Sequence, residues 1–441
     1  MQKIWVRNSV LILCLLLLVI EHLAAQDRFP KPEFETDYEQ PLTTTPKPRT
    51  AFYEIFDIIV LVSALSLASY FALKKRSRRG IFWLTIFSVI YFGFIREGCV
   101  CAVGSIQNIS LALADTSFII PVTVILFFAL PLLFTLFFGR TFCAAVCPLG
   151  AIQDIVILRP AKLPAWASQV LGLLPYLYLG LAVLFAATGS AFIICRYDPF
   201  VSIFRLGANF NMIVYSAAFL LLSVFIARPY CRFLCPYGVL LSWMSRLSRR
   251  RVKTTPDTCV QCRLCEDACP FDAIRKPTLE KAPESREQGI RRLAILIVLL
   301  PIIMATFGWS VAQLHQVLAR VHPFVDLAEQ IKIEDAGISK ETTLESKTFR
   351  ATGTTSRELF NKSITIRKRF YTGGWILGGF IGLVFALKLI GLSVRRTRTD
   401  YEPDRAACFS CARCFSYCPK EHVRLKNNKS NEPHYKKKSC F

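Results

Sequence analysis

The sequence predicts a mainly α-helical membrane protein, a bundle of helices that crosses the bilayer several times. Three observations support this fold class. Hydrophobic residues make up 53 % of the 441 residues, charged residues make up only 19 %, and apolar stretches of about 20 residues recur along the chain. This composition excludes a disordered chain and disfavours an ordinary soluble domain.

The N-terminus has the pattern of a secretory signal. Two basic residues, Lys3 and Arg7, precede an apolar stretch over 10–20, and small residues follow it. Residues 1–25 are therefore interpreted as a signal peptide or as a retained anchor helix. The next segment, 26–52, is rich in Pro, Thr and acidic residues and has no apolar period, which predicts an extended extracytoplasmic tether.

Seven further apolar stretches have the length that the hydrocarbon core of a membrane requires. Five of them form a transmembrane domain over 53–240, and the last two, within 291–394, flank an outer loop over 314–372. The predicted spans are 53–73, 81–97, 118–138, 168–189, 211–228, 292–313 and 374–394.

The loop charges orient these spans. If residue 26 lies outside, the basic runs 74–79, 249–251 and 395–398 all lie inside, as the positive-inside rule requires. We therefore expect a multi-pass inner (cell) membrane protein whose mature N-terminus is outside and whose C-terminus is cytoplasmic. The formal net charge of +23 follows mostly from this topology, so it is no argument for nucleic-acid binding.

Two cysteine runs carry the strongest chemical signal. Each has the spacing C-x2-C-x2-C-x3-C-P, which is the bacterial ferredoxin run, and the two lie in segments 241–290 and 395–441. Three thiolates of such a run wrap one [4Fe–4S] cluster, and the fourth ligates the cluster of the other run. The expected ligand sets are Cys259, Cys262 and Cys265 with Cys418, and Cys408, Cys411 and Cys414 with Cys269.

The topology allows this exchange of ligands. Two spans separate the runs, and because two is an even number, both runs lie on the cytoplasmic side. We therefore predict one small ferredoxin-like domain with two clusters, assembled from two separated segments. The alternatives are a structural zinc site and disulfides. Four-ligand zinc sites usually pair two separate C-x2-C units, however, and the inner side is reducing.

A second cysteine pattern lies close to the predicted spans. Three segments, 96–104, 140–150 and 228–238, share R-x2-C, a second Cys, and a Gly three residues beyond it; residues 104–108 and 150–154 extend the match between the first two. In the last two segments the spacing is C-x3-C-P. Their cysteines share the inner surface, where they are expected to hold a further iron–sulfur centre or to be small buried residues. These four are Cys143, Cys147, Cys231 and Cys235.

Three cysteines fall on the outer side by the same count of spans. Cys99, Cys101 and Cys195 are candidate ligands of a cofactor near the outer surface, and equally candidates for a disulfide that leaves one thiol free. Also outside, R-x-[DH]-P-F-V occurs at 196–201 and at 320–325. It is interpreted as an interfacial turn, with contact to a quinol head group or a partner protein as the alternative.

Other features narrow the choice of cofactor. No C-x-x-C-H occurs, and none of the five histidines is central in a span, which argues against c-type and membrane b-type haem. The segment 351–356 is similar to the Thr-attachment motif of covalent flavin subunits, but the outer loop is short for that domain, so flavin is disfavoured. Gly374, Gly378 and Gly382 are four residues apart, which is typical of close helix packing.

With C-x3-C-P twice at the membrane and two ferredoxin runs, the chain resembles the membrane polyferredoxins of the NapH/NosR group. The resemblance covers residues 80 to 274 well and the C-terminal run moderately. It implies inner-membrane electron transfer, often to an extracytoplasmic reductase, through the C-x3-C-P cysteines and the eight ferredoxin cysteines. In this chain the runs are split by two spans, the Gly98-Cys99-Val100-Cys101 segment is additional, and the large flavin domain of some members is missing.

The leading hypothesis is therefore a lipid-embedded iron–sulfur protein with two [4Fe–4S] clusters and no identifiable substrate site. It would relay electrons between the cytoplasmic face or the quinol pool and an extracytoplasmic acceptor, with a ferredoxin or quinol as donor. Because about 30 Å of membrane exceeds one tunnelling step, such a relay needs a carrier near the outer side. The rival hypothesis is a maturation or regulatory factor that uses the same clusters to reduce a metal or to sense redox state.

Overall fold

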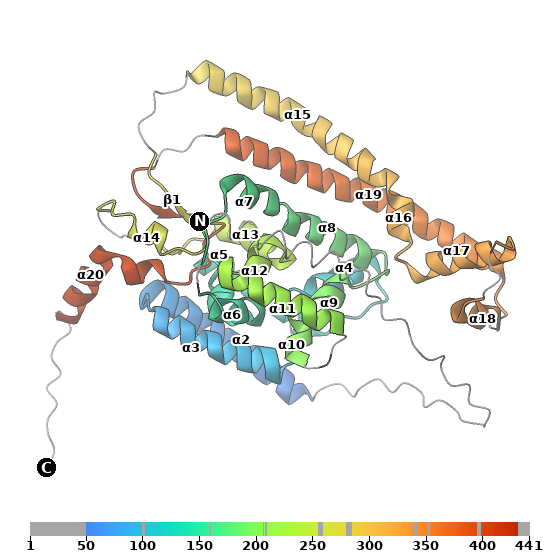
Figure 1. Ribbon diagram of the computed structural model, residues 1–441, viewed down its shortest axis with the longest axis horizontal. Coiled ribbons are helices and arrows are strands. Elements are labelled where there is room, and N and C mark those ends of the chain that lie inside the picture. The colour runs from blue at the N-terminus through green and yellow to red at the C-terminus, as the bar shows by residue number, and fades with distance from the viewer. Residues whose placement is uncertain are drawn as a thin grey trace, which may run out of the picture.

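The computed structural model describes residues 50–98, 102–158, 160–205, 207, 210–254, 259–278, 285–338, 342–351, 353–394 and 398–430. The signal peptide, nearly all of the tether, Cys99, Cys101 and part of the last basic run lie outside the described residues. The described chain is mainly helical, and its one small sheet joins two strands of two residues each (Figure 1).

The N-terminal half forms a compact helical body. Its elements are α2 (Ala51–Ser69), η1 (Tyr70–Lys74), α3 (Arg78–Ser88), η2 (Val89–Ile95), α4 (Ser105–Ala114), α5 (Val122–Phe138), η3 (Phe142–Val146), α6 (Pro148–Ile155), α7 (Ala165–Leu171), α8 (Leu174–Ala187), α9 (Ile193–Tyr197), α10 (Val201–Arg205), α11 (Phe210–Phe225), α12 (Pro229–Phe233) and α13 (Pro236–Arg246). The first three η elements are π-helical.

The C-terminal half adds a long helical pair and the segments of the two cysteine runs. Its elements are α14 (Leu264–Asp267), β1 (Ile274–Arg275), α15 (Arg286–Gln313), α16 (His315–Ala319), α17 (Pro323–Asp335), α18 (Leu344–Ala351), α19 (Ser356–Ser393), β2 (Glu402–Pro403), the 3-10 helix η4 (Cys414–Tyr417) and α20 (Pro419–Ser430).

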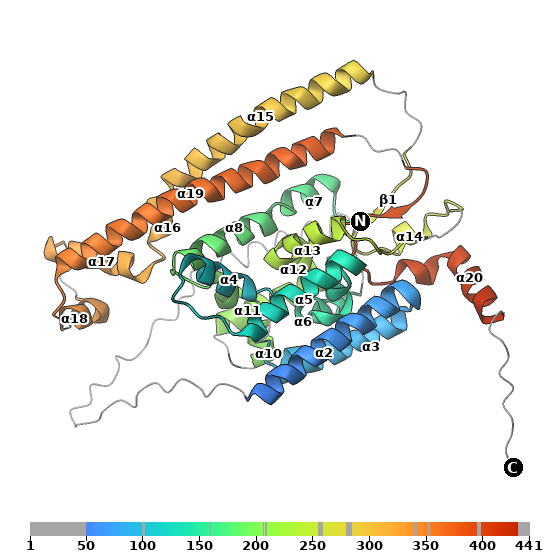
Figure 2. The ribbon, with the colours of Figure 1, turned by 180° about the vertical axis from the view of Figure 1, so that it is seen from behind.

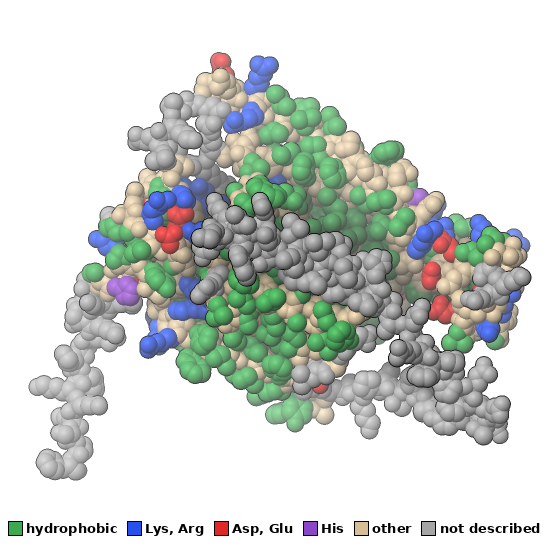
Figure 3. Space-filling model, in the orientation of Figure 1, with side chains coloured by type: hydrophobic (Ala, Val, Ile, Leu, Met, Phe, Trp, Pro, Cys, Tyr) green, Lys and Arg blue, Asp and Glu red, His purple; other side chains and the backbone are tan. Residues whose placement is uncertain are grey.

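Five helical segments are long and apolar enough to cross a membrane: Ala51–Lys74, Arg78–Ile95, Ala165–Ala187, Glu287–Gln313 and Ser356–Ser393. The other two predicted spans correspond to shorter apolar helices, α5 and α11. A mainly helical protein with several candidate membrane spans is therefore confirmed, and the count of seven stays a prediction. Charged side chains gather near α14 and near α17 and α18, and much of the visible surface between them is hydrophobic (Figure 3).

The pair α15 and α19 lies side by side over its length (Figures 1 and 2). The three spaced glycines of α19 face the backbone of α15. A Cβ built on Gly374 would lie 3.0 Å from Ala312 Cα, and one on Gly382 would lie 2.9 Å from the Ile303 carbonyl oxygen. Small residues therefore permit a backbone approach that larger side chains would prevent, as expected for membrane helices.

The strands β1 and β2 join parts of the chain that are far apart in sequence. They pair antiparallel, with Ile274 opposite Pro403 and Arg275 opposite Glu402. The Asp404 amide extends the contact by donating to the Ala273 carbonyl at 2.7 Å. Through this pairing the segment after the first cysteine run lies against the segment before the second, at the same end of the helical body (Figure 1).

The two R-x-[DH]-P-F-V segments form turns that start helices. The Asp198 carboxylate accepts the Phe200 amide at 2.9 Å before α10, and His322 Nδ1 accepts the Phe324 amide at 3.2 Å at the start of α17. Side chains that accept a hydrogen bond from their own turn in this way are typical of helix starts.

Candidate metal centres

The structure brings the eight ferredoxin cysteines into two groups of four. One cavity is lined by Cys259, Cys262 and Cys265 of the first run and by Cys418 of the second. We call these four residues the first set. A second cavity is lined by Cys269, Cys408, Cys411 and Cys414, which we call the second set. Each set thus takes three cysteines from one run and one from the other.

The two runs also share a backbone conformation. In each run the residue before the second cysteine and the residue after it have positive φ: Gln261 and Arg263 in the first, Ser410 and Ala412 in the second. Alternation of left-handed and ordinary residues turns successive N–H groups toward one side, which suits an anionic group. The Ser410 amide, for example, donates to Cys408 Sγ at 3.5 Å.

The donor set fits a [4Fe–4S] cluster. Such a cluster takes four thiolates, and each cavity offers four cysteines around about 340 Å³ of space, part of it open to solvent. Among the described residues, no three His, Cys, Asp or Glu side chains are placed to hold a single metal ion. When bound, the clusters would supply one-electron chemistry, and the protein would supply ligands, burial and nearby charge.

Burial makes these thiols poor acids without a metal. Desolvation, together with the neighbouring thiols, raises the pKa of Cys265 to about 11 and that of Cys408 to about 12. Because iron binds the thiolate, loading a cluster must remove these protons. Each set has two buried cysteines, and the sets differ in exposure at one position: Cys262 of the first set is exposed, whereas no cysteine of the second set is.

The second run is held against the helical body by polar contacts. Arg76 pairs with the buried Glu421 carboxylate at 2.6 Å, and its guanidinium lies 4.7 Å from the centre of the Phe415 ring. Arg140 Nη1 donates to the Ala406 carbonyl at 2.8 Å, and Ser245 Oγ donates to the Arg405 carbonyl at 2.6 Å. These contacts place the second set directly against the ends of the body's helices.

Replacing Glu421 by Gln should loosen this contact, because the Arg76 charge would lose its carboxylate partner in a mostly buried place. Breaking such a pair costs roughly 3 kcal/mol. Amides of 408–421 should then exchange hydrogen roughly 100-fold faster, as measured by mass spectrometry. Glu358→Gln, which breaks an exposed pair with Lys362, should leave this exchange unchanged. Equal effects of the two variants would contradict the proposed anchoring.

The two C-x3-C-P segments pack against each other reciprocally. A Cβ on Gly150 would lie 3.5 Å from Arg228 Nη1, and one on Gly238 would lie 3.4 Å from Arg140 Nη2. Each segment's arginine therefore lies against the other segment's glycine. Arg228 Nη1 also donates to the Cys143 carbonyl, and its Nη2 donates to the Ala144 carbonyl at 3.0 Å.

The four thiols of these segments are buried. Cys147 and Cys235 occupy the N-cap positions of α6 and α13, each directly before the proline that begins the helix. Cys143 accepts a contact from Arg140 Nη2 at 3.8 Å, and Cys231 accepts one from Gln153 Nε2 at 3.5 Å. The structure thus packs the two C-x3-C-P segments together, next to the second set.

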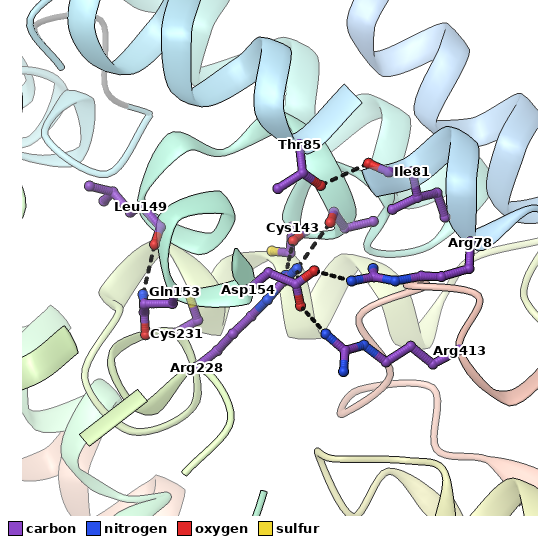
Figure 4. A network of polar contacts seen from close by, with 11 residues as sticks. Arg78, Ile81, Thr85, Cys143, Leu149, Gln153, Asp154, Arg228, Cys231 and Arg413 are labelled. Atoms are coloured by element: carbon purple, nitrogen blue, oxygen red, sulfur yellow. Dashed lines mark hydrogen bonds and ion pairs between the residues drawn. The ribbon is translucent and has the colours of Figure 1, made fainter. Parts of the chain in front are cut away.

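A carboxylate joins these segments to the second run (Figure 4). Asp154 accepts hydrogen bonds from Arg78 Nη2 at 2.5 Å and from Arg413 Nη2 at 3.1 Å, and it forms an ion pair with Arg228 Nη2 at 3.1 Å. Burial opposes ionisation of Asp154, but the three guanidinium groups outweigh it and hold its pKa well below the usual range. We call Asp154, Arg78, Arg228 and Arg413 the Asp154 network.

Sequence reasoning did not assign these residues a role, although one signal pointed to Asp154 and to its neighbour Gln153. The repeat of 104–108 at 150–154 aligns Gln107 with Gln153 and Asn108 with Asp154. Gln153 Oε1 accepts the Tyr230 amide at 3.2 Å, one residue before Cys231. Gln107 Oε1 likewise accepts the amides of Ile194 and Cys195, at 3.1 and 3.4 Å. The repeat thus marks two glutamines that each hold a cysteine segment.

Of the outer cysteines, only Cys195 lies in the part of the chain that the structure describes. It is in α9 and is exposed. Cys99 and Cys101 lie outside the described residues.

Comparison with known families agrees with this geometry. A family model described as a 4Fe-4S binding domain matches residues 120–165 and 208–255, which include the C-x3-C-P cysteines. A second model with the same description matches residues 252–275, the first ferredoxin run. No solved structure matches the chain.

Curated relatives match part of the chain. An uncharacterized protein of Methanocaldococcus jannaschii is 30 % identical over 191 residues, covering 41 % of this chain and 77 % of the relative. A putative electron transport protein, YccM of Escherichia coli, is 26 % identical over 31 % of this chain. The regulatory protein NosR of Pseudomonas aeruginosa is 29 % identical over 34 % of it. The matches span 43 % of YccM and 24 % of NosR.

Proposed function

We propose that this chain, which belongs to the membrane polyferredoxins of the NapH/NosR type, relays single electrons between the cytoplasmic face or the quinol pool and an acceptor outside the membrane. The observation that carries the proposal is the exchange of ligands between the two runs. Eight cysteines from segments far apart in sequence line two cavities, four in each. Two one-electron centres within a single small unit are suited to passing electrons on.

Burial and position give the two centres different roles in the proposed relay. The first set includes the exposed Cys262 and therefore faces a soluble or membrane-surface partner. The second set lies against the helical body, next to the C-x3-C-P segments. We propose a third iron–sulfur centre at Cys143, Cys147, Cys231 and Cys235, because these four buried thiols, which are soft ligands, come from two segments that pack against each other next to the second set.

The outer half of the relay needs its own carrier, because about 30 Å of membrane is too far for one step. Cys99, Cys101 and Cys195 are the soft ligands that we propose for it, with a disulfide among them as the alternative. The cytoplasmic placement of both runs and the inner-membrane location belong to the same proposal, since they follow from the loop charges.

A regulatory or maturation role is the second candidate. It is favoured by one observation, that the relative from P. aeruginosa is named a regulatory protein. In that role the clusters would reduce a metal or report redox state to another protein, and no electron would need to cross the membrane.

Reconstitution separates the two candidates. The cluster-loaded full chain is placed in liposomes that contain ferricyanide, and the impermeant reductant titanium(III) citrate is added outside under anaerobic conditions. A relay should reduce the trapped ferricyanide faster than in protein-free liposomes, and Cys411→Ser should abolish the difference. Clusters that become reduced while the trapped ferricyanide stays oxidised would contradict the relay and favour the regulatory role.

A further inference from the structure

The Asp154 network carries more positive than negative charge in a buried place. Three guanidinium groups share one carboxylate, and the side chains of Asp154 and Arg228 are both 0 % exposed. Arg140 adds a fourth guanidinium beside them and lies in no ion pair among the described residues. Charges that water does not screen act strongly on their surroundings, so this excess matters for any charged group nearby.

The excess charge lies next to the second set. The Arg140 guanidinium is 4.4 Å from the centre of the Phe409 ring, and that of Arg228 is 5.6 Å from Phe271 and 5.8 Å from Phe409. Both rings line the second cavity, and so does Arg413. The Arg228 charge also interacts electrostatically with the Cys411, Cys231 and Cys143 thiols.

Among the described residues, the first set has no equivalent. Arg263 and Lys420 line its cavity, but Arg263 is 62 % exposed and its charge is partly balanced by Glu266 at 3.9 Å. Exposed charges of this kind are screened by water and salt. The buried, uncompensated charge is therefore specific to the second set.

We propose that the Asp154 network and Arg140 raise the reduction potential of the centre at the second set above that of the centre at the first set. Reduction adds a negative charge to a cluster, and fixed positive charge close by stabilises that reduced state. This inference rests on the proposed function, because it takes both sets to hold iron–sulfur clusters. Electrons that enter at the exposed first centre then move downhill toward the helical body. The four arginines and Asp154 are positioning residues, because they place positive charge beside the second set.

The same network fixes the distance between the second set and the C-x3-C-P segments. Asp154 lies in α6, the helix that begins at Pro148 directly after Cys147, whereas Arg228 precedes Cys231 and Arg413 lies between Cys411 and Cys414. One carboxylate thus connects both C-x3-C-P segments to the second ferredoxin run. The charge that sets the potential also holds the next electron-transfer step in place.

The test is an EPR-monitored redox titration of the anaerobically purified full chain, with signals assigned by the loss of one of them in Cys411→Ser. Arg228→Gln and Arg413→Gln should lower the potential of the second centre and leave that of the first unchanged. Asp154→Asn should raise the potential of the second centre. Arg228→Lys, which keeps the charge but not the planar fork, should stay nearer the unmodified chain than Arg228→Gln.

Asp267→Asn is the matched control, because Asp267 lies two residues from Cys269 of the second set but is an exposed carboxylate that pairs with Lys162. It should leave the second centre unchanged. If the Arg228→Gln variant does not take up its clusters, the Arg413→Gln variant provides the test, because Arg413 is partly exposed. The inference is overturned if loaded variants leave the second potential unmoved, shift both potentials equally, or if Arg228→Lys shifts it as far as Arg228→Gln. If the unmodified chain itself purified without clusters, this result would overturn the proposed function instead.

Discussion

Replacing Cys418 by Ala should remove the cluster of the first run, although Cys418 lies in the second run. Its side chain lines the cavity of Cys259, Cys262 and Cys265, and a missing thiolate leaves one iron without a protein ligand. Iron content should fall by about four per chain, the iron of one [4Fe–4S] cluster. EPR of the reduced protein should lose one of its signals and keep the other.

The matched variants make this result specific. Cys259→Ala should remove the same EPR signal as Cys418→Ala. Cys269→Ala and Cys408→Ala should each remove the other signal. Each pair of variants that removes the same signal thus combines one cysteine from each run. If Cys418→Ala and Cys408→Ala removed the same signal, each run would bind its own cluster and the exchange of ligands would be wrong.

Replacing Gly378 by Leu should separate α15 from α19. A Cβ on Gly378 meets the backbone of Phe307 and would lie 2.7 Å from Gly308 Cα, and backbone cannot move aside as a side chain can. Overpacking of this kind costs on the order of 3 kcal/mol or more. In detergent the chain should unfold at a clearly lower temperature, and engineered cysteine pairs across the two helices should crosslink less.

The neighbouring glycine provides the control. Gly379 has no heavy atom within 4 Å of the place where a Cβ would be, so Gly379→Leu adds the same side chain to open space. We expect little change in its unfolding temperature. Leu favours helix more than Gly does, so an equal loss of stability in the two variants would show that the close contact with α15 is not its cause.

Several features of the fold could be predicted from the sequence because they depend on local patterns. Apolar stretches indicated the membrane helices, and the glycine spacing indicated the helix pair. The cysteine spacing predicted which cysteines share a set, and the structure groups Cys418 and Cys269 in that way. That grouping needed only the known geometry of a ferredoxin run and the parity of the spans between the two runs.

The Asp154 network could not be predicted from the sequence. Its members come from α3, α6, the residue before α12 and the second run, and no sequence period connects these elements. Arg78 belongs to a basic run that indicated the orientation of the spans in the membrane, and Arg228 lies at the end of a predicted span. Only the folded arrangement shows that both charges turn inward to one carboxylate. Two span boundaries also differ from the prediction: α5 begins at Val122, four residues after the predicted start at 118, and α11 ends at Phe225, three residues before the predicted end at 228.

The central claim is that this membrane chain holds two iron–sulfur centres on crossed cysteine sets. Metal analysis combined with EPR on the anaerobically purified full chain tests it most directly. The account expects about eight irons per chain in two [4Fe–4S] clusters that each take up one electron, or about twelve if the C-x3-C-P cysteines hold a third. Zinc in place of iron, with no EPR signal on reduction, would contradict it.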